Sequence, residues 1–446
     1  MTKKKNSILR TAAGIVFAMI LLFGTALPGF ADSFSAGQDA SDPATAAITK
    51  VFKLPVNTTT PAATFTFKIT PVGVGDETDN VTIGKMPALG SNGYATVSFL
   101  LNETETFTDS GTRYFVAQTD DILAGINANG SDWKAGPGIY KYTIEEVSGG
   151  ITSNAGPNDT EFTNYSEALY DLEVWVDEDE YGVLFARYIV GFYVPGTPDE
   201  YYPEEPGDGK LDPTPGTIVP GTPEEIGQNY SSLIFTNRYW KTSGTPGTDP
   251  DLNGLAVKKL VVSNNPDPNA SFEFKVTVTT PAAVGDPGKT YEAFIVDKDD
   301  VIVTGSGSIF TSGTEKSIWL KQDERLVFFE LEVGAEVQVY EVIVQGTRVK
   351  YSHSFGPNAN TEYLMPVNQQ GDWGFPLGKD DAGPHYTMEG AGANIATFTN
   401  SMSGNPPTGI NMDILPYIII IALVAGGLTA YIVVRSRQSQ SAKYDA

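Results

Sequence analysis

A lysine, a glutamate and an asparagine recur in the same order in two blocks of this sequence. The first block opens on Ala46-Ala-Ile48-Thr-Lys50 and the second on Leu255-Ala-Val257-Lys-Lys259, each with the spacing apolar-x-apolar-x-Lys. Alternate residues of a strand point to the same face. Lys50 and Lys259 therefore share a face with apolar neighbours, where an unpaired ammonium group is costly to bury.

Three further landmarks follow each lysine. Aromatic pairs come first, in Phe65-Thr-Phe67-Lys68 and Phe272-Glu-Phe274-Lys275. A glutamate then ends an alternating apolar run, in Tyr140-x-Tyr142-x-Ile144-x-Glu146 and Val337-x-Val339-x-Glu341. An asparagine closes each block, in Ile234-Phe-Thr-Asn237 and Ala396-Thr-Phe-Thr-Asn400. Four landmarks in register indicate an internal repeat.

Such a set of residues can form a covalent bond once water is excluded. Burial favours the neutral amine and the neutral carboxylic acid. A neutral amine is a nucleophile, and the acid can donate a hydrogen bond to the asparagine carbonyl oxygen, where charge develops. Attack on the side-chain amide would expel ammonia. The repeat therefore predicts a Lys–Asn isopeptide bond between the first and last strands of each block.

Neighbouring residues offer alternatives for three of these positions. Lys258 adjoins Lys259, but the strand alternation points Lys258 to solvent, and the same alternation favours Glu146 over Glu145. Phe162-Thr-Asn164 repeats the asparagine motif in the middle of the first block. Asn237 is preferred because it closes the block before a polar linker, and Asn164 stays a competitor.

The elements that must position these residues are strands. Alternating runs rich in Thr, Val, Tyr and Phe are separated by Gly, Pro, Asn and Asp, and helical periodicity is confined to the two ends of the chain. Clear examples are the runs 64–69, 140–144, 170–176 and 183–189. The acidic segment 177–182 between the last two is read as a hairpin turn rather than a calcium loop.

Composition excludes several kinds of site. The chain has no cysteine, so disulfides, catalytic thiols and Cys-based metal sites are ruled out. Its two histidines, His353 and His385, lie in segments containing Gly, Pro or Asn, which gives little support to a histidine-based triad or a zinc site. No metal and no cofactor is expected. A net charge of −25 makes nucleic acid an unlikely partner.

Both ends of the chain carry targeting signals. A basic start, an apolar run from Thr11 to Leu27 and the small residues at 29–31 predict a secretory signal peptide over residues 1–31. Near the other end, the apolar stretch 414–434 has the length of about 20 residues that a helix needs to cross a bilayer. Basic residues in the tail 435–446 favour a cytoplasmic C-terminus.

The pentapeptide Asn405-Pro406-Pro407-Thr408-Gly409 lies just before this stretch, and the whole arrangement resembles a Gram-positive cell-wall sorting signal. The resemblance implies that a sortase cuts between Thr408 and Gly409 and joins Thr408 to an amine. The commonest motif begins with leucine, whereas this one begins with Asn405, which leaves the class of sortase open.

The blocks also resemble a known family. Gly138-Ile-Tyr-Lys-Tyr-Thr-Ile-Glu-Glu146, Phe235-Thr-Asn-Arg-Tyr239 and the run 318–326 followed by Gly334 and Glu341 are similar to the isopeptide-forming domains of Gram-positive pilins, of the FctA and CnaB-like kind. The resemblance implies an all-β chain of two tandem immunoglobulin-like sandwiches. It also implies two triads in which the glutamate is catalytic, namely Lys50, Glu146 and Asn237, and Lys259, Glu341 and Asn400.

The predicted organisation follows from these signals. After the signal peptide 1–31 it comprises a sandwich over 44–240 with a Pro-rich surface insertion at about 195–229, a linker over 241–253, a sandwich over 254–403, the sorting motif 405–409, the transmembrane segment 414–434 and the cytoplasmic tail 435–446.

The predicted function is structural. We expect a cell-wall-anchored pilin subunit or stalk on a Gram-positive surface, and the alternative is a monomeric wall-anchored adhesin that binds a host or surface ligand. The expected partners are a sortase, peptidoglycan or other pilin subunits, and the membrane through the C-terminal segment before sorting. Polymerisation would need an accessible lysine, for which Lys210 and Lys241 are the candidates. No enzyme activity is expected beyond the single-turnover cross-linking.

Overall fold

The computed structural model describes residues 34–127, 130–153, 159–197, 209–243, 255–263, 267–328, 330–343, 348–353, 362–364, 371–375, 386–387 and 394–401. The predicted signal peptide, the sorting motif with Thr408 and Gly409, the apolar stretch 414–434 and the tail lie outside these residues. No helix in the described part of the chain combines the length and apolar character that a membrane crossing requires.

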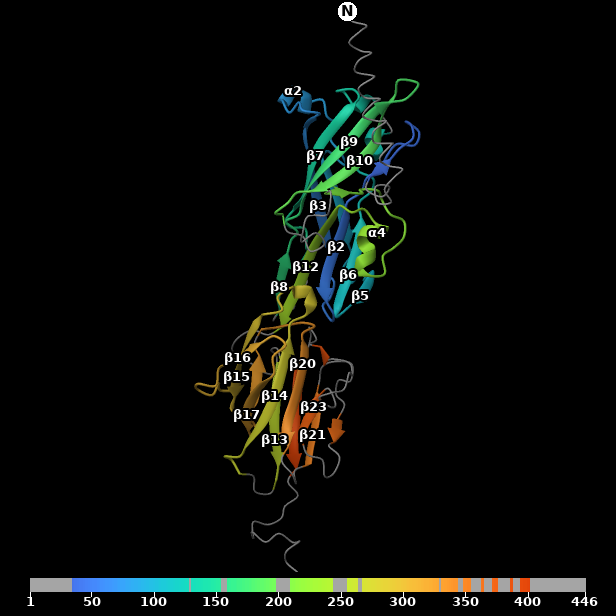
Figure 1. Cartoon of the computed structure of the whole chain (residues 1–446). Coiled ribbons are helices and arrows are strands. Elements are labelled where there is room, and N and C mark those ends of the chain that lie inside the picture. The colour runs from blue at the N-terminus through green and yellow to red at the C-terminus, as the bar shows by residue number, and fades with distance from the viewer. Residues whose placement is uncertain are drawn as a thin grey trace, which may run out of the picture.

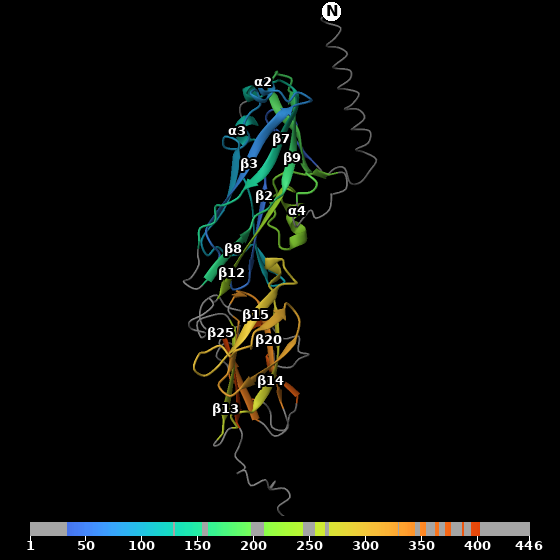
Figure 2. The same cartoon turned by 90° about the vertical axis from the view of Figure 1, so that its left-hand side faces the viewer.

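Strands dominate the described chain and build two β-sandwiches stacked end to end (Figures 1 and 2). The blue and green sandwich near the N-terminus comes from the first sequence block, and the yellow to red sandwich comes from the second. The predicted all-β class is therefore confirmed. The described helices are single turns, namely α2 (Asn80–Ile83), α3 (Ala124–Asn127), η1 (Gly130–Asp132), η2 (Pro223–Glu225), α4 (Ile226–Asn229) and η3 (Ala282–Val284).

The first sandwich packs a seven-stranded sheet against a six-stranded sheet. The larger sheet has the order β1 (Ser35–Ala36), β10 (Leu184–Tyr193), β9 (Leu169–Glu178), β7 (Gly138–Val147), β3 (Ala63–Val74) and β4 (Tyr94–Phe99), with β11 (Lys210–Leu211) also paired to β10. The smaller sheet has the order β19 (Leu331–Glu332), β12 (Ile234–Ser243), β2 (Thr49–Pro55), β6 (Thr112–Gln118) and β5 (Phe107–Asp109), with β8 (Asp159–Asn164) also paired to β12.

The second sandwich repeats this plan. One sheet has the order β16 (Ser308–Thr311), β15 (Thr290–Val296), β18 (Arg325–Phe328), β13 (Leu255–Val262), β25 (Asn394–Ser401), β21 (Arg348–His353) and β22 (Glu362–Leu364). The other has the order β17 (Lys316–Lys321), β14 (Ser271–Thr279), β20 (Glu336–Ile343) and β23 (Gly371–Phe375), with β24 (Tyr386–Thr387) also paired to β20.

Aromatic side chains from the two sheets of each sandwich meet in its core. In the first, the rings of Phe52 on β2 and Phe65 on β3 have centroids 5.1 Å apart. In the second, the rings of Phe398 on β25 and Phe274 on β14 are also 5.1 Å apart and edge-to-face. Such pairs add a directional attraction to the burial of apolar surface. Both cores therefore fix the register of the facing sheets close to the landmarks that the two blocks share.

The first and last strands of each sequence block are parallel neighbours. In the first sandwich β2 pairs with β12, and in the second β13 pairs with β25. Lys50 and Lys259 are fully buried, as predicted. Burial itself does not alternate in β2, because all of its residues are buried. A chain that enters along the first strand thus leaves along the strand beside it, at the opposite end of the sandwich.

The insertion at 195–229 is more than the surface excursion that its composition predicts. Among its described residues, Leu211 of β11 is buried, and Ile226 of α4 is fully buried. Ile226 packs with Val51, Tyr114, Val116 and Ile234 on the outer face of the smaller sheet. The prediction was wrong here because the few apolar residues of the insertion are spaced to cover a sheet face that strand alternation also leaves apolar.

The predicted linker begins later than position 241. β12 continues to Ser243 and pairs with β19 of the second block, with Thr242 opposite Glu332. Lys241 is 3% exposed, and its Nζ donates to Thr59 Oγ1 at 3.1 Å. Its expected accessibility is therefore wrong, because the strand carries it into the junction between the sandwiches.

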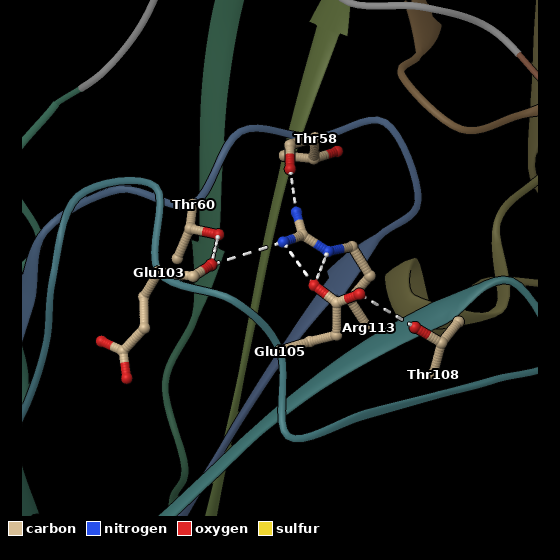
Figure 3. A network of polar contacts seen from close by, with 6 residues as sticks. All are labelled: Thr58, Thr60, Glu103, Glu105, Thr108 and Arg113. Carbon is tan, nitrogen blue, oxygen red and sulfur yellow. Dashed lines mark hydrogen bonds and ion pairs between the residues drawn. The ribbon is translucent and has the colours of Figure 1, made fainter.

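The two sandwiches also approach closely at Gly334, whose backbone lies beside Pro55 and Val56 of the first sandwich. Its φ of +88° suits glycine, and a Cβ at this position would lie 2.6 Å from Val56 O. Arg113 holds the contacted loop in place (Figure 3). Its guanidinium donates to Thr58 O at 2.6 Å and to Glu105 Oε2 at 2.8 and 3.0 Å. The loop after β2 is thereby tied to β6 before it meets the second sandwich.

Candidate cross-linking sites

Lys50 is the second residue of β2 and lies opposite Phe235 of β12. Its side chain is fully buried, and Nζ donates to Glu146 Oε2 at 2.6 Å. The same nitrogen lies 4.5 Å from the centre of the Phe65 ring. An aromatic ring attracts a cation through its face but cannot take a proton from it. The described contacts of the amine thus include the Glu146 carboxylate and the face of an aromatic ring.

Glu146 comes from β7 in the facing sheet, where it is opposite Phe67 of β3. Its side chain is 0% exposed, and Oε1 accepts a hydrogen bond from Asn237 Nδ2 at 2.5 Å. Glu145, the neighbouring alternative, is exposed and forms a surface ion pair with Lys68. The carboxylate of Glu146 thus touches both the lysine and the asparagine.

Asn237, rather than Asn164, completes this set. It lies opposite Phe52 of β2, two residues further along the parallel pair than the position of Lys50. Residues two apart share a face, which brings the two side chains together. Asn237 is fully buried, and its Oδ1 accepts from Ser166 N at 2.7 Å. Asn164 is exposed and lies opposite Arg238 in the ladder.

The second sandwich builds the same arrangement from its own residues. Lys259 lies opposite Phe398, and Asn400 lies opposite Val261, again two residues along. Glu341 of β20 lies opposite Phe274 of β14. Lys259 Nζ donates to the two carboxylate oxygens of Glu341 at 2.8 and 2.9 Å, and Asn400 Nδ2 donates to Oε1 at 2.6 Å. The match extends to register, side-chain contacts and burial.

Phe65 and Phe272 have a role that the sequence pattern did not assign. Phe272 lies under Lys259 Nζ at 4.3 Å from its ring centre, as Phe65 lies under Lys50. The sequence carried a signal for both, since the two aromatic pairs recur at the same place in the repeat. Each ring covers one side of the amine and keeps water from it there.

The electrostatics of the second site point the same way. Burial lowers the pKa of Lys259 to about 8, against the opposing attraction of Glu341. Burial also raises the pKa of Glu341, which Lys259 and Asn400 partly offset. Both shifts favour the pair in which the proton has moved from the amine to the carboxylate.

The orientation of the amides differs from the sequence-based expectation. In both sites the amide nitrogen, not the carbonyl oxygen, faces the glutamate. The acid is therefore positioned to give a proton to the nitrogen that would leave rather than to stabilise charge on the oxygen. In the first site the oxygen has another donor, the backbone N–H of Ser166.

We predict a pH effect on the second sandwich in the Asn400→Ala variant, in which Lys259 has no amide to attack. Its pKa is about 8 in the fold against an ordinary 10.5, so between these values the unfolded chain binds more protons. The free energy of unfolding should therefore rise with pH, by about 1–3 kcal/mol between pH 7.5 and 10. Urea unfolding at the two pH values measures it.

The double variant Lys259→Met, Asn400→Ala is the control, since it lacks this titration but keeps every other lysine and tyrosine. The effect is the difference between the two variants. An equal pH slope in both would contradict the lowered pKa of Lys259.

Other groups that the sequence singled out carry no cross-linking geometry. Asp179 Oδ1 accepts from Tyr181 N and Val183 N at 2.9 and 2.8 Å, which forms the tip of the turn between β9 and β10. The acidic segment 177–182 is thus the predicted hairpin turn. No group of His, Asp and Glu residues in the described ranges is arranged to hold a metal ion.

Comparison with known proteins gives one family match and several structural neighbours. A family described as a domain of unknown function, DUF7601, matches residues 253–363. No curated protein matches the sequence. The chain is similar to the major pilin protein T-13 of Streptococcus pyogenes, with 16% identity, a TM-score of 0.28, and coverage of 83% of this chain and 100% of that chain.

Two further solved structures are also similar to this chain at low sequence identity. One is the major pilin from Streptococcus pyogenes, with 18% identity, a TM-score of 0.28, and coverage of 80% of this chain and 98% of that chain. The other is a pilus-presented adhesin, Cpa, with 13% identity, a TM-score of 0.20, and coverage of 53% of this chain and 36% of that chain. The structural neighbours of this chain thus include streptococcal major pilins and a pilus-presented adhesin.

Proposed function

We propose that this chain is a structural surface protein of a Gram-positive bacterium, a wall-anchored pilin subunit or stalk, with a self-catalysed Lys–Asn isopeptide bond in each sandwich. One observation carries the proposal. Two buried Lys–Glu–Asn sets, far apart in the sequence, have the same register and the same hydrogen bonds. A buried ion pair is weak evidence for stability on its own, so a shared chemical role explains its duplication better.

The reaction balances with the groups present. The glutamate takes a proton from the lysine ammonium, and the neutral amine attacks the side-chain carbonyl carbon of the asparagine. The acid then protonates the amide nitrogen, the C–N bond breaks and ammonia leaves. The lysine nitrogen, now bonded to the carbonyl carbon, loses its extra proton to the carboxylate. The products are a secondary amide, ammonia and a neutral glutamic acid, and the step needs no cofactor.

Intact-mass analysis of the full chain tests the proposal. We expect the mass to fall short of the sequence mass by two ammonia molecules, about 17 Da each, because each bond is a covalent change. Glu146→Ala and Glu341→Ala should each restore one ammonia. Asn164→Ala is the matched control and should leave both losses in place. A wild-type mass equal to the sequence mass would reject the chemistry.

Anchoring and assembly complete the proposed role. Thr408 would be joined by a sortase to peptidoglycan or to an amine of the next subunit, as the sorting motif implies. Lys241 is 3% exposed and is a poor acceptor, whereas Lys210 on β11 is exposed. A ladder of covalent oligomers on a denaturing gel, formed with a pilin sortase, would support a polymerising subunit. A single wall-linked species would support a monomeric adhesin instead.

A further inference from the structure

The two cross-linking sites differ in what faces the oxygen of the asparagine amide. In the first sandwich, β8 pairs with β12 from Asp159 opposite Ser243 to Asn164 opposite Arg238. The chain then leaves the ladder, one residue before it would come opposite Asn237. Ser166, two residues beyond the end of β8, donates its backbone N–H to Asn237 Oδ1 at 2.7 Å.

In the second sandwich the corresponding strand does not leave. β21 stays paired with β25 from Arg348 opposite Ser401 to His353 opposite Ala396, and Val349 lies opposite Asn400. The backbone beside Asn400 is therefore part of a continuous ladder. Asn400 Oδ1 is buried, and no group in the described part of the chain donates a hydrogen bond to it.

The donor at Ser166 fixes the orientation of the Asn237 amide. A backbone N–H can only donate, so the amide oxygen must face Ser166 and the amide nitrogen must face Glu146. The leaving nitrogen is thereby presented to the acid. In the second site the contact with Glu341 is the one described hydrogen bond that orients the amide, within the residues that the structure describes.

The same donor acts on the transition state. When the amine attacks, the double bond to oxygen opens and negative charge collects on Oδ1. A fixed N–H at 2.7 Å in a water-excluded site stabilises that charge without reorganising. A carbonyl oxygen without a donor must develop the charge unaided, in surroundings where an unpaired charge is costly.

We propose that the backbone N–H of Ser166 is the oxyanion donor for cross-linking in the first sandwich, and that this sandwich links faster than the second. The inference rests on the proposed isopeptide chemistry and adds a group to it. It assigns a function to the segment that follows Asn164, the asparagine that competed with Asn237 in the sequence.

A time course of cross-linking in the full chain tests this. The chain is made by brief cell-free synthesis and quenched in acid at intervals, and peptide mass spectrometry after proteolysis measures the linked fraction at each site. In the wild type, the Lys50–Asn237 link should form at least about tenfold faster than the Lys259–Asn400 link, since loss of one oxyanion donor costs about 100-fold or more in rate. Equal rates, or a faster second site, would overturn the inference.

Two substitutions at one position separate the N–H from the side chain. Ser166→Pro removes the N–H and should slow the first link about 100-fold. Ser166→Ala keeps the N–H, removes only the hydroxyl that accepts from Ala168 N, and should link at the wild-type rate. The second link in the same molecules is the internal clock and should not change.

The outcomes distinguish this inference from the proposed function. If neither link forms in the wild type, the isopeptide proposal itself fails. If both links form and Ser166→Pro matches the wild type, only the role of Ser166 fails. Should Ser166→Pro disturb the first sandwich, the wild-type comparison of the two sites decides, because it needs no substitution.

Discussion

Pulled from its two ends in a single-molecule force experiment, the wild-type chain will show no extension from the residues between Lys50 and Asn237, whereas Asn237→Ala will release roughly 600 Å of chain. β2 and β12 are parallel neighbours, and the chain enters and leaves the sandwich at opposite ends (Figure 1). With the link in place, tension passes from Lys50 directly to Asn237. The residues between them carry no load. Without the link they unravel, at about 3.4 Å per residue.

The second site should behave alike with a shorter length. Asn400→Ala is expected to release roughly 450 Å, because fewer residues lie between Lys259 and Asn400. Asn164→Ala is the control and should pull like the wild type. A wild-type trace that contains either of these steps would contradict a covalent link in that sandwich.

The junction between the sandwiches also lies in the load path. Its described contacts include a two-residue pairing of β12 with β19 and the approach of Gly334 to Val56. Those contacts involve hydrogen bonds and packing, each worth on the order of 1 kcal/mol. The short chain between Ser243 and Leu255 limits how far the sandwiches can separate.

Strand alternation predicted which of two adjacent residues would be buried. It separated Glu146 from Glu145, and the structure has the first buried against Lys50 and the second in a surface pair. The same rule turned Lys259 inward and Lys258 outward, and Lys259 is fully buried while Lys258 is less so. A period of two survives in any sheet, whatever its partners.

Strand alternation does not predict contacts between strands that are distant in the sequence. The donation from Ser166 to Asn237 depends on where β8 leaves the ladder, which no local pattern encodes. The extension of β12 into the second sandwich depends on a partner strand some 90 residues later. The local sequence around Lys241 therefore predicts a linker instead of a strand. Ile226 covers the outer face of the smaller sheet, although it belongs to a segment whose composition is typical of a loop. Each of these features is set by tertiary pairing rather than by propensity.

Asn400→Ala should also lower the midpoint of thermal unfolding of the second sandwich by about 10–20 °C. The lost link closes a loop of about 140 residues, and a cross-link over such a loop contributes about 5 kcal/mol through the unfolded chain. For a domain of this size, 1 kcal/mol shifts the midpoint by about 2–4 °C. Scanning calorimetry of the full chain measures the shift, and the transition of the first sandwich should stay in place.

Asn394→Ala separates the link from ordinary packing. Asn394 lies on the same strand, β25, and is 2% exposed, as Asn400 is, but it has no place in the cross-linking set. Its replacement removes buried polar contacts worth about 1–3 kcal/mol. Both links should still form, so the mass of the variant should remain two ammonia molecules below the mass calculated from its own sequence. If the two variants lower the midpoint equally, the buried Lys259, Glu341 and Asn400 act only as a polar network. If Asn400→Ala lowers the midpoint of thermal unfolding by more than Asn394→Ala does, packing does not explain the difference. A covalent bond between the first and last strands of this sandwich does.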